Sequence, residues 1–311
     1  PYWRMVRRET SLDPTASEMA WAAVEAVAST GGQIMPPVMG AAAFLMATFL
    51  GISYTQVALA ALLPALLYYI SLFIQVDLQA ARYGLRGLSK EELPNFKHIL
   101  SQGWLFLFPI SVLVYVLFFT GLEAEVAGLY ATGAVFLVSF LKKASRVTFR
   151  KLLIILEKTG ESLLEIAVVS AVAGLIIGIV ALTGLGFTFS RAVVSMAGGN
   201  FFLLLVLAAV AAGILGMGMT VTAAYILVVI LVAPALVQLG IDPLTAHMFV
   251  FYFAVLSFLT PPVCLAVYAA AAIGGTNLLR TAFQAMRLAI VAYVVPFIFA
   301  YKPALLLRGS V

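Results

Sequence analysis

The chain has 311 residues, of which 64% are hydrophobic and 10% are charged, and its formal net charge is +5. A soluble domain has roughly a quarter of its residues charged, so this composition excludes a soluble globular protein. Several apolar stretches exceed the roughly 20 residues that cross a bilayer as a helix, and the sequence predicts an all-α polytopic membrane protein.

The positive charge lies in short loops beside apolar segments, as in cytoplasmic loops of membrane proteins, and does not indicate nucleic-acid binding. The single cysteine, Cys264, excludes an intramolecular disulfide, and we interpret it as a packing residue. His98 and His247 have no ligand partners at metal-binding spacing and are interpreted as structural. The lipid bilayer is the first expected partner.

The first helix is predicted to begin at Asp13-Pro14, an N-cap followed by a proline in the first turn, and to run to Thr30. Gly31-Gly32 breaks it. After Pro36-Pro37 an Ala-rich helix continues to about Gly51. An apolar helix interrupted in this way is unusual at membrane depth, because unpaired backbone is tolerated there only where protein or a cavity satisfies it.

Further spans are predicted at 54–76, 103–121, 126–141, 166–182 and 283–300. The basic loops 77–100 and 142–160 flank a pair of spans joined by the acidic turn Glu123–Glu125, so both loops are predicted to be cytoplasmic. Residues Arg146–Lys158 fit either a helix on the membrane surface or a cytoplasmic extension of the next span. Segment 184–200 is expected to be an irregular connection or a short helix.

Two short apolar arms, 201–215 and 223–239, are joined by the Gly- and Thr-rich segment Gly216–Thr222. Neither arm is comfortably long enough to span a bilayer, and together they predict a re-entrant hairpin over 201–239. A second broken helix is predicted over 243–273. It begins after Asp242 and is interrupted at Ser257–Pro262.

The two broken helices form an internal repeat. Pro36-Pro37-Val38 reappears as Pro261-Pro262-Val263, 225 positions later, and an Asp-Pro helix start lies upstream of each copy. Such repeats are typical of secondary transporters. A hairpin precedes the second copy but not the first, so we expect the first hairpin to be missing from an amino-terminally truncated chain. The predicted domains are the end of a first repeat (1–51), scaffold spans (52–160) and a second repeat (161–311).

At a helix break, carbonyl groups end one half-helix and N–H groups begin the next, so the gap can hold a cation or an anionic group. Neither break contains a titratable residue, which favours Na⁺ coupling over a proton relay. Glu25, one turn before the first break, is interpreted as an ion-site neighbour or as an interhelical hydrogen-bonding residue.

The predicted Na⁺ ligands are carbonyls and hydroxyls near Gly216, Gly218, Ser257 and Thr260. The candidate ion- and substrate-binding residues are Ser29, Thr30, Gly31, Gly32, Pro36, Pro37, Gly216, Met217, Gly218, Thr220, Thr222, Ser257, Thr260, Pro261 and Pro262.

Three segments carry a family resemblance: ASTGGQIMPPVMGAAAFLMA, GMGMTVTAAYILVVILVAPALVQLGIDP and LSFLTPPVCLAVYAAAAI. They resemble the large membrane subunit of the tripartite ATP-independent periplasmic (TRAP) transporters, and most of all the fused permease class paired with TAXI-type binding proteins. The resemblance covers nearly the whole chain from Asp13. It implies that the hairpin tip and the two breaks frame ion sites with substrate between them.

The resemblance implies an elevator-type transporter in a bacterial or archaeal cytoplasmic membrane. It further implies Na⁺-coupled import of small organic anions, such as carboxylates, from a TAXI-type periplasmic binding protein. A small membrane subunit, or its fused equivalent, is the other expected partner. No cofactor is expected, with Na⁺ acting only as the coupling ion, and no HExxH or GxSxG motif indicates an enzyme. The alternative reading is a non-transporting structural or channel subunit, or an inactive fragment.

Overall fold

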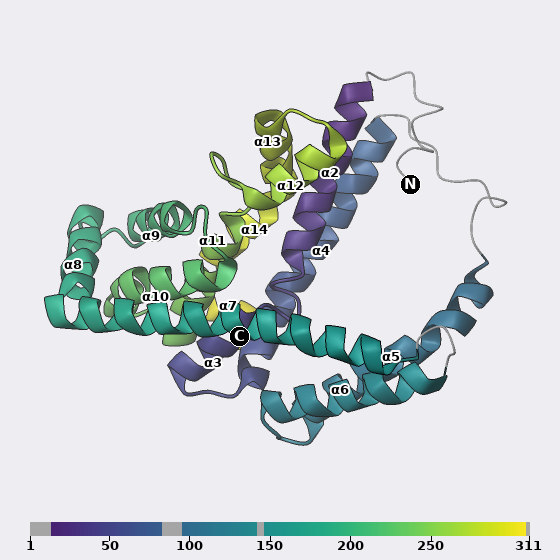
Figure 1. Ribbon diagram of the computed structural model, residues 1–311. Helices are drawn as coiled ribbons and strands as arrows, with labels where there is room; N and C mark the ends of the chain where they lie inside the picture. The colour runs from purple at the N-terminus through teal and green to yellow at the C-terminus, as the bar shows by residue number, and fades with distance from the viewer. Residues whose placement is uncertain (1–13, 83–94, 142–145, 309–311) are drawn as a thin grey trace. The chain divides into compact units, whose positions relative to one another are not determined.

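The computed structural model describes residues 14–82, 95–141 and 146–308, and within these ranges every regular element is a helix (Figure 1). Four of the described helices are long and apolar enough to cross a membrane, or five if one bent pair is a single span. The expected all-α polytopic fold is confirmed. The N-cap predicted at Asp13, residues 83–94 of the first basic loop and residues 142–145 of the second lie outside the described residues.

The described part of the chain contains thirteen α-helices and one 3₁₀ helix. In chain order they are α2 (Pro14–Gly31), α3 (Ala41–Leu50), α4 (Tyr54–Arg82), α5 (Phe96–Phe119), α6 (Ala124–Leu141), α7 (Phe149–Thr183), α8 (Leu185–Ala197), α9 (Phe201–Leu215), α10 (Val221–Gln238), α11 (Pro243–Leu256), α12 (Leu265–Gly274), α13 (Leu278–Leu288), α14 (Ile290–Tyr301) and the short 3₁₀ helix η2 (Pro303–Leu306).

Polar side chains fix where the helices of the carboxyl-terminal half begin. Asn200, Thr220, Asp242 and Asn277 are the N-caps of α9, α10, α11 and α13, and each accepts a hydrogen bond from the backbone N–H three residues on. These bonds satisfy N–H groups that have no partner within the helix. The Asp-Pro helix start predicted at 242–243 is therefore observed, with Asp242 Oδ2 at 3.2 Å from the Thr245 nitrogen.

Two open sequence interpretations are resolved in the region before the hairpin. Residues 149–183 form one continuous helix, α7, so the basic segment is an extension of the following span and not a separate surface helix. Segment 184–200 contains a regular 13-residue helix, α8, between two glycines with positive φ, Gly184 and Gly198.

The last span predicted at 283–300 is longer and is bent. The region folds as α13 and α14, which meet at an angle of 44°. Residues 278–282 precede the predicted start of the span, but they belong to α13, which buries one face, including Thr281, Ala285 and Leu288, and packs against α2. A side chain satisfies the backbone at the bend, because Gln75 Nε2 donates to the Leu288 carbonyl at 2.8 Å.

The chain divides into two compact units. One contains α2, α3, nearly all of α4 and the chain from Val172 onward. The other contains α5, α6 and the first part of α7, and in it α5 packs against α6. Every candidate ion- and substrate-binding residue lies in the first unit.

Helix α11 forms the core of the first unit. All its residues except Pro243 and His247 are buried, and it contacts α3, α9, α10 and α14. A helix that is apolar all round is expected to be enclosed by protein or lipid. His247 has a structural partner, since its Nδ1 lies 2.8 Å from the Tyr225 hydroxyl of α10.

We expect Asp242→Ala to lower the free energy of unfolding by about 0.5–2 kcal/mol, because the first turn of α11 loses its side-chain acceptor. Thermal unfolding of the detergent-solubilised protein measures the loss. Asp242→Asn, which keeps an acceptor oxygen, is the control. An equal loss in both variants would show that the cap is not the cause.

Candidate functional site

The two helix breaks have the same local structure. In the first, α2 ends at Gly31 and α3 begins at Ala41; in the second, α11 ends at Leu256 and α12 begins at Leu265. Both proline pairs contain a cis peptide bond. The residues two positions after each pair, Met39 (φ 44°) and Cys264 (φ 34°), both adopt the left-handed conformation.

The resumed helices match as well. α3 and α12 have 10 residues each and end at glycines with φ values of 63° (Gly51) and 65° (Gly275). A left-handed glycine is a common helix terminator because it has no Cβ to clash. The two sequence copies therefore fold alike.

The two broken helices are also interleaved. The helix after the second break, α12, packs against α2, and the helix after the first break, α3, packs against α10 and α11. Figure 1 shows α12 beside α2. Each resumed half-helix thus lies against the helix that precedes the other break.

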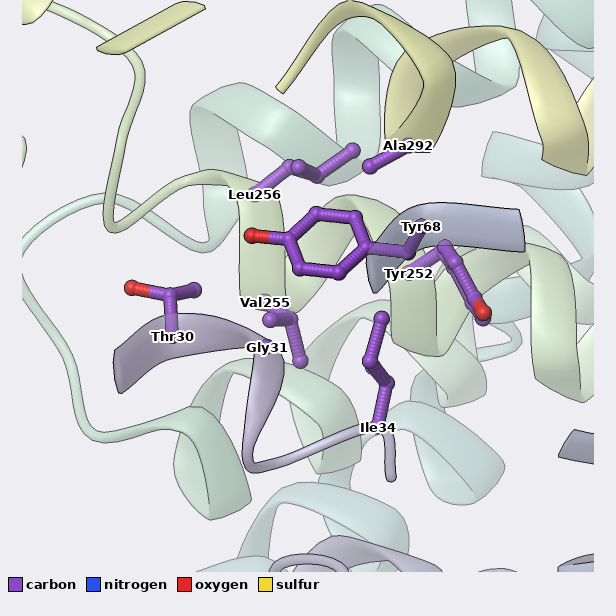
Figure 2. Close-up of a pocket in the computed structure, with 8 residues that line it drawn as sticks. All are labelled: Thr30, Gly31, Ile34, Tyr68, Tyr252, Val255, Leu256 and Ala292. Carbon is purple, nitrogen blue, oxygen red and sulfur yellow. The ribbon is translucent and has the colours of Figure 1, made fainter. Parts of the chain in front are cut away.

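A small pocket lies where the ends of α2 and α11 meet. Tyr68 of α4 crosses it, between Leu256 and Ala292 on one side and Val255 and Ile34 on the other (Figure 2). Thr30, Gly31 and Tyr252 complete the lining. The cavity measures about 10 Å³, which is the space of roughly one water molecule, so it is too small for an organic anion.

The hairpin tip is joined to the second break by a buried hydrogen bond. Ser257 is 2% exposed, and its Oγ lies 3.0 Å from the Gly216 carbonyl oxygen and 2.7 Å from the Ala254 carbonyl oxygen. A hydroxyl has one hydrogen, so the two carbonyls share it. The approach depends on Gly216, because a Cβ there would lie 3.0 Å from Ser257 Oγ.

The rest of the tip turns toward the same break. Gly218 has φ 77°, and a Cβ placed on it would lie 3.8 Å from a methyl group of Val263. Thr220 caps α10, with its Oγ1 3.4 Å from the Ala223 nitrogen. Met217 and Thr222 are half-buried on either side. The structure thus brings together the tip 216–222 and the break 257–262, as the sequence predicted.

The first break is held differently. Thr30 is buried and lines the pocket, whereas Ser29 and Gly32 are exposed and are not hydrogen-bonded to the hairpin tip among the described contacts. The Ser29 hydroxyl instead donates to the Ala26 carbonyl at 3.2 Å. Glu25 is exposed on α2 and does not line the pocket.

Three tyrosines hold oxygen atoms at the breaks, and the sequence analysis missed them. The hydroxyls of Tyr68 and Tyr69 donate to the carbonyls of Val27 and Ala28, in the last turns of α2, at 2.5 and 3.1 Å. The Tyr293 hydroxyl lies 2.7 Å from Thr260 Oγ1. The signal was present, since Tyr68 and Tyr293 are 225 residues apart, the same offset that relates the proline pairs.

The oxygens near the tip suit a hard cation. The Gly216 carbonyl and the hydroxyls of Ser257 and Thr260 are neutral, and such oxygens are the ligands that alkali and alkaline-earth ions prefer. Among the described residues, no group of three or more His, Cys, Asp or Glu side chains can hold a metal ion. Within 216–222 and 257–262, the oxygens available to a cation are backbone carbonyls and hydroxyls.

An internal repeat of broken helices is typical of secondary membrane transporters. The family model described as tripartite ATP-independent periplasmic transporter, DctM component, matches residues 16–311, and the chain belongs to this family. No curated protein matches the chain. The chain is thus the large permease component of a TRAP transporter and not an enzyme, and its family works with a periplasmic binding protein and a small membrane subunit.

We expect Gly216→Ala to destabilise the protein, because the new methyl group would press on Ser257 Oγ and on the Ala212 carbonyl, each 3.0 Å away. Ser257 cannot retreat without losing a hydrogen bond to Gly216 or Ala254. The midpoint of thermal unfolding in detergent is the measurement.

Gly213→Ala, on the same helix, is the matched control for this variant. A Cβ at Gly213 meets no atom within 4 Å, so this change is expected to be neutral or to stabilise by up to about 1 kcal/mol. Equal midpoints for the two variants would contradict a tight contact between the tip and the break.

Proposed function

We propose that this permease is part of a Na⁺-coupled importer of small organic anions, most simply carboxylates, in a bacterial or archaeal cytoplasmic membrane. A TAXI-type periplasmic protein delivers the substrate. The observation that carries the proposal is the buried hydrogen bond between Ser257 and the Gly216 carbonyl, which joins the hairpin tip to the second break.

The coupling ion is Na⁺ because the oxygens at this junction are uncharged. The Gly216 carbonyl keeps one free lone pair after accepting from Ser257, and the oxygens of Ser257 and Thr260 can also turn a lone pair toward an ion. A proton relay would need carboxylates or histidines, and the described segments 29–37, 216–222 and 257–262 contain neither.

The anionic group of the substrate binds where half-helices begin. Helix α10 begins at Val221 and α12 at Leu265, next to the tip and to the second break. The first-turn N–H groups carry partial positive charge and favour a carboxylate. The pocket between α2 and α11 has space for about one water molecule, so the substrate site lies outside it.

Transport proceeds by an elevator movement, with the first unit as the moving body. That unit holds both breaks and the hairpin, and the interleaved packing of α12 on α2 and of α3 on α11 lets it move as one piece. A rigid carrier is what such a movement requires, because the site must cross the membrane without losing its geometry.

We expect substrate uptake into proteoliposomes, with the binding protein supplied outside, to require an inward Na⁺ gradient. Replacing Na⁺ by K⁺ or choline at equal ionic strength should reduce uptake to background. The natural transporter that contains this chain is used, with empty liposomes as the blank. Uptake that is indifferent to Na⁺ would refute the coupling.

Two substitutions test whether the binding site lies at the hairpin tip and the second break. Thr260→Ala removes a candidate ligand, and Gly218→Val puts a β-branched residue at φ 77°, so we expect either change to abolish uptake while the protein still inserts into the membrane. Thr260→Ser keeps the hydroxyl and should retain uptake.

Gly240→Val is the control for backbone strain. Gly240 has φ 90°, but it follows α10, and a Cβ there meets no atom within 4 Å. We expect this variant to transport if it inserts. Normal uptake by Thr260→Ala or Gly218→Val would mean that the site lies elsewhere.

A further inference from the structure

The hydroxyl of Thr260, at the second break, makes two hydrogen bonds. Its Oγ1 lies 2.8 Å from the Leu256 carbonyl oxygen and 2.7 Å from the Tyr293 hydroxyl. A carbonyl can only accept, so the single hydrogen of Thr260 points to Leu256. The Tyr293 phenol must then be the donor in the second bond.

This arrangement decides what Thr260 can offer to a third partner. Its proton is committed to Leu256 and one lone pair is committed to Tyr293, so one lone pair remains. A hydroxyl fixed in this way can act only as an acceptor, which is the state that a cation ligand needs.

The repeat shows that the tyrosine position is not accidental. Tyr68 stands 225 residues before Tyr293 and donates to the Val27 carbonyl near the first break. Both tyrosines follow the resumed half-helix of their own repeat and reach back to its broken helix. At the same offset, Met35 stands where the second repeat has Thr260, so the first repeat has no hydroxyl at the position that Tyr293 contacts in the second.

We propose that Tyr293 is a positioning residue for the cation site at the second break, and that it acts by holding the Thr260 hydroxyl as an acceptor. The phenol does not itself bind the ion. This inference rests on the proposed Na⁺ coupling, and its test is chosen to separate the two.

The test measures Na⁺ binding without substrate. An ion that binds only the folded protein raises the unfolding temperature, so the midpoint as a function of Na⁺ concentration gives the half-saturating concentration. The detergent-solubilised natural protein is titrated with NaCl, with choline chloride keeping the ionic strength constant.

Tyr293→Phe removes only the donor and keeps the ring that lies edge-on to Phe253, at a centroid distance of 6.5 Å. Loss of one hydrogen bond should raise the half-saturating Na⁺ concentration roughly three- to tenfold. Tyr301→Phe, at an exposed tyrosine at the end of the same helix, should leave it unchanged.

A double variant tests the route through Thr260. If Tyr293 acts only through this hydroxyl, Tyr293→Phe should change nothing further in a Thr260→Ala background. An additional loss of Na⁺ affinity in the double variant would overturn the positioning role, because the phenol would then contribute by another route.

The remaining outcomes separate the two proposals. In one outcome Na⁺ stabilises the natural protein, and Tyr293→Phe lowers the midpoint of thermal unfolding without changing the half-saturating Na⁺ concentration. The phenol is then structural only, and the positioning role fails while the proposed Na⁺ coupling stands. If Na⁺ does not stabilise the natural protein at all, the proposed coupling fails and the positioning role fails with it.

Discussion

The structure depends on one constraint: a helix interrupted inside an apolar core leaves backbone groups that need partners from elsewhere in the protein. At the hairpin tip the Gly216 carbonyl is satisfied by Ser257, and near the first break the Val27 carbonyl, in the last turns of α2, accepts a further hydrogen bond from Tyr68. At the bend of the last span Gln75 does the same for Leu288. Each irregular point is thus tied to a distant helix by a side-chain donor, which makes the breaks fixed parts of the fold.

These ties bear on the proposed cation site, which would be built from neutral oxygens in the first unit. Neutral carbonyls and hydroxyls bind a small cation well only when they already converge, since each one alone attracts the ion weakly. The packing of the two broken helices couples their breaks. Because α12 lies on α2 and α3 lies on α11, neither break can move without disturbing the other. The glycines at the contacts serve the same purpose, because Gly31 leaves room for the Tyr68 ring and Gly216 leaves room for Ser257.

The sequence predicted the second half of the candidate site more fully than the first. The tip at 216–222 and the break at 257–262 were recognisable from glycine and proline placed inside apolar helices, and the structure joins them through Ser257. The roles of Tyr68, Tyr69 and Tyr293 were not predicted, because the sequence around a tyrosine in an apolar helix does not indicate which group its hydroxyl contacts. The bend in the last span was missed because no glycine or proline marks the point between Leu288 and Ile290 where α13 ends and α14 begins.

The sequence by itself determined the class of protein, the positions of the helix breaks and their repetition, because hydropathy, Gly-Gly and Pro-Pro act through the local backbone. The comparison with known families then placed residues 16–311 in the DctM family of permeases. Only the tertiary structure decided which oxygens meet: Ser257 with Gly216 across 41 residues, Tyr68 with Val27 across another 41, and Tyr293 with Thr260 across 33. The physical reason is that a hydrogen bond requires its donor and acceptor atoms to lie about 3 Å apart. For segments that are distant in sequence, this distance is set by how whole helices pack.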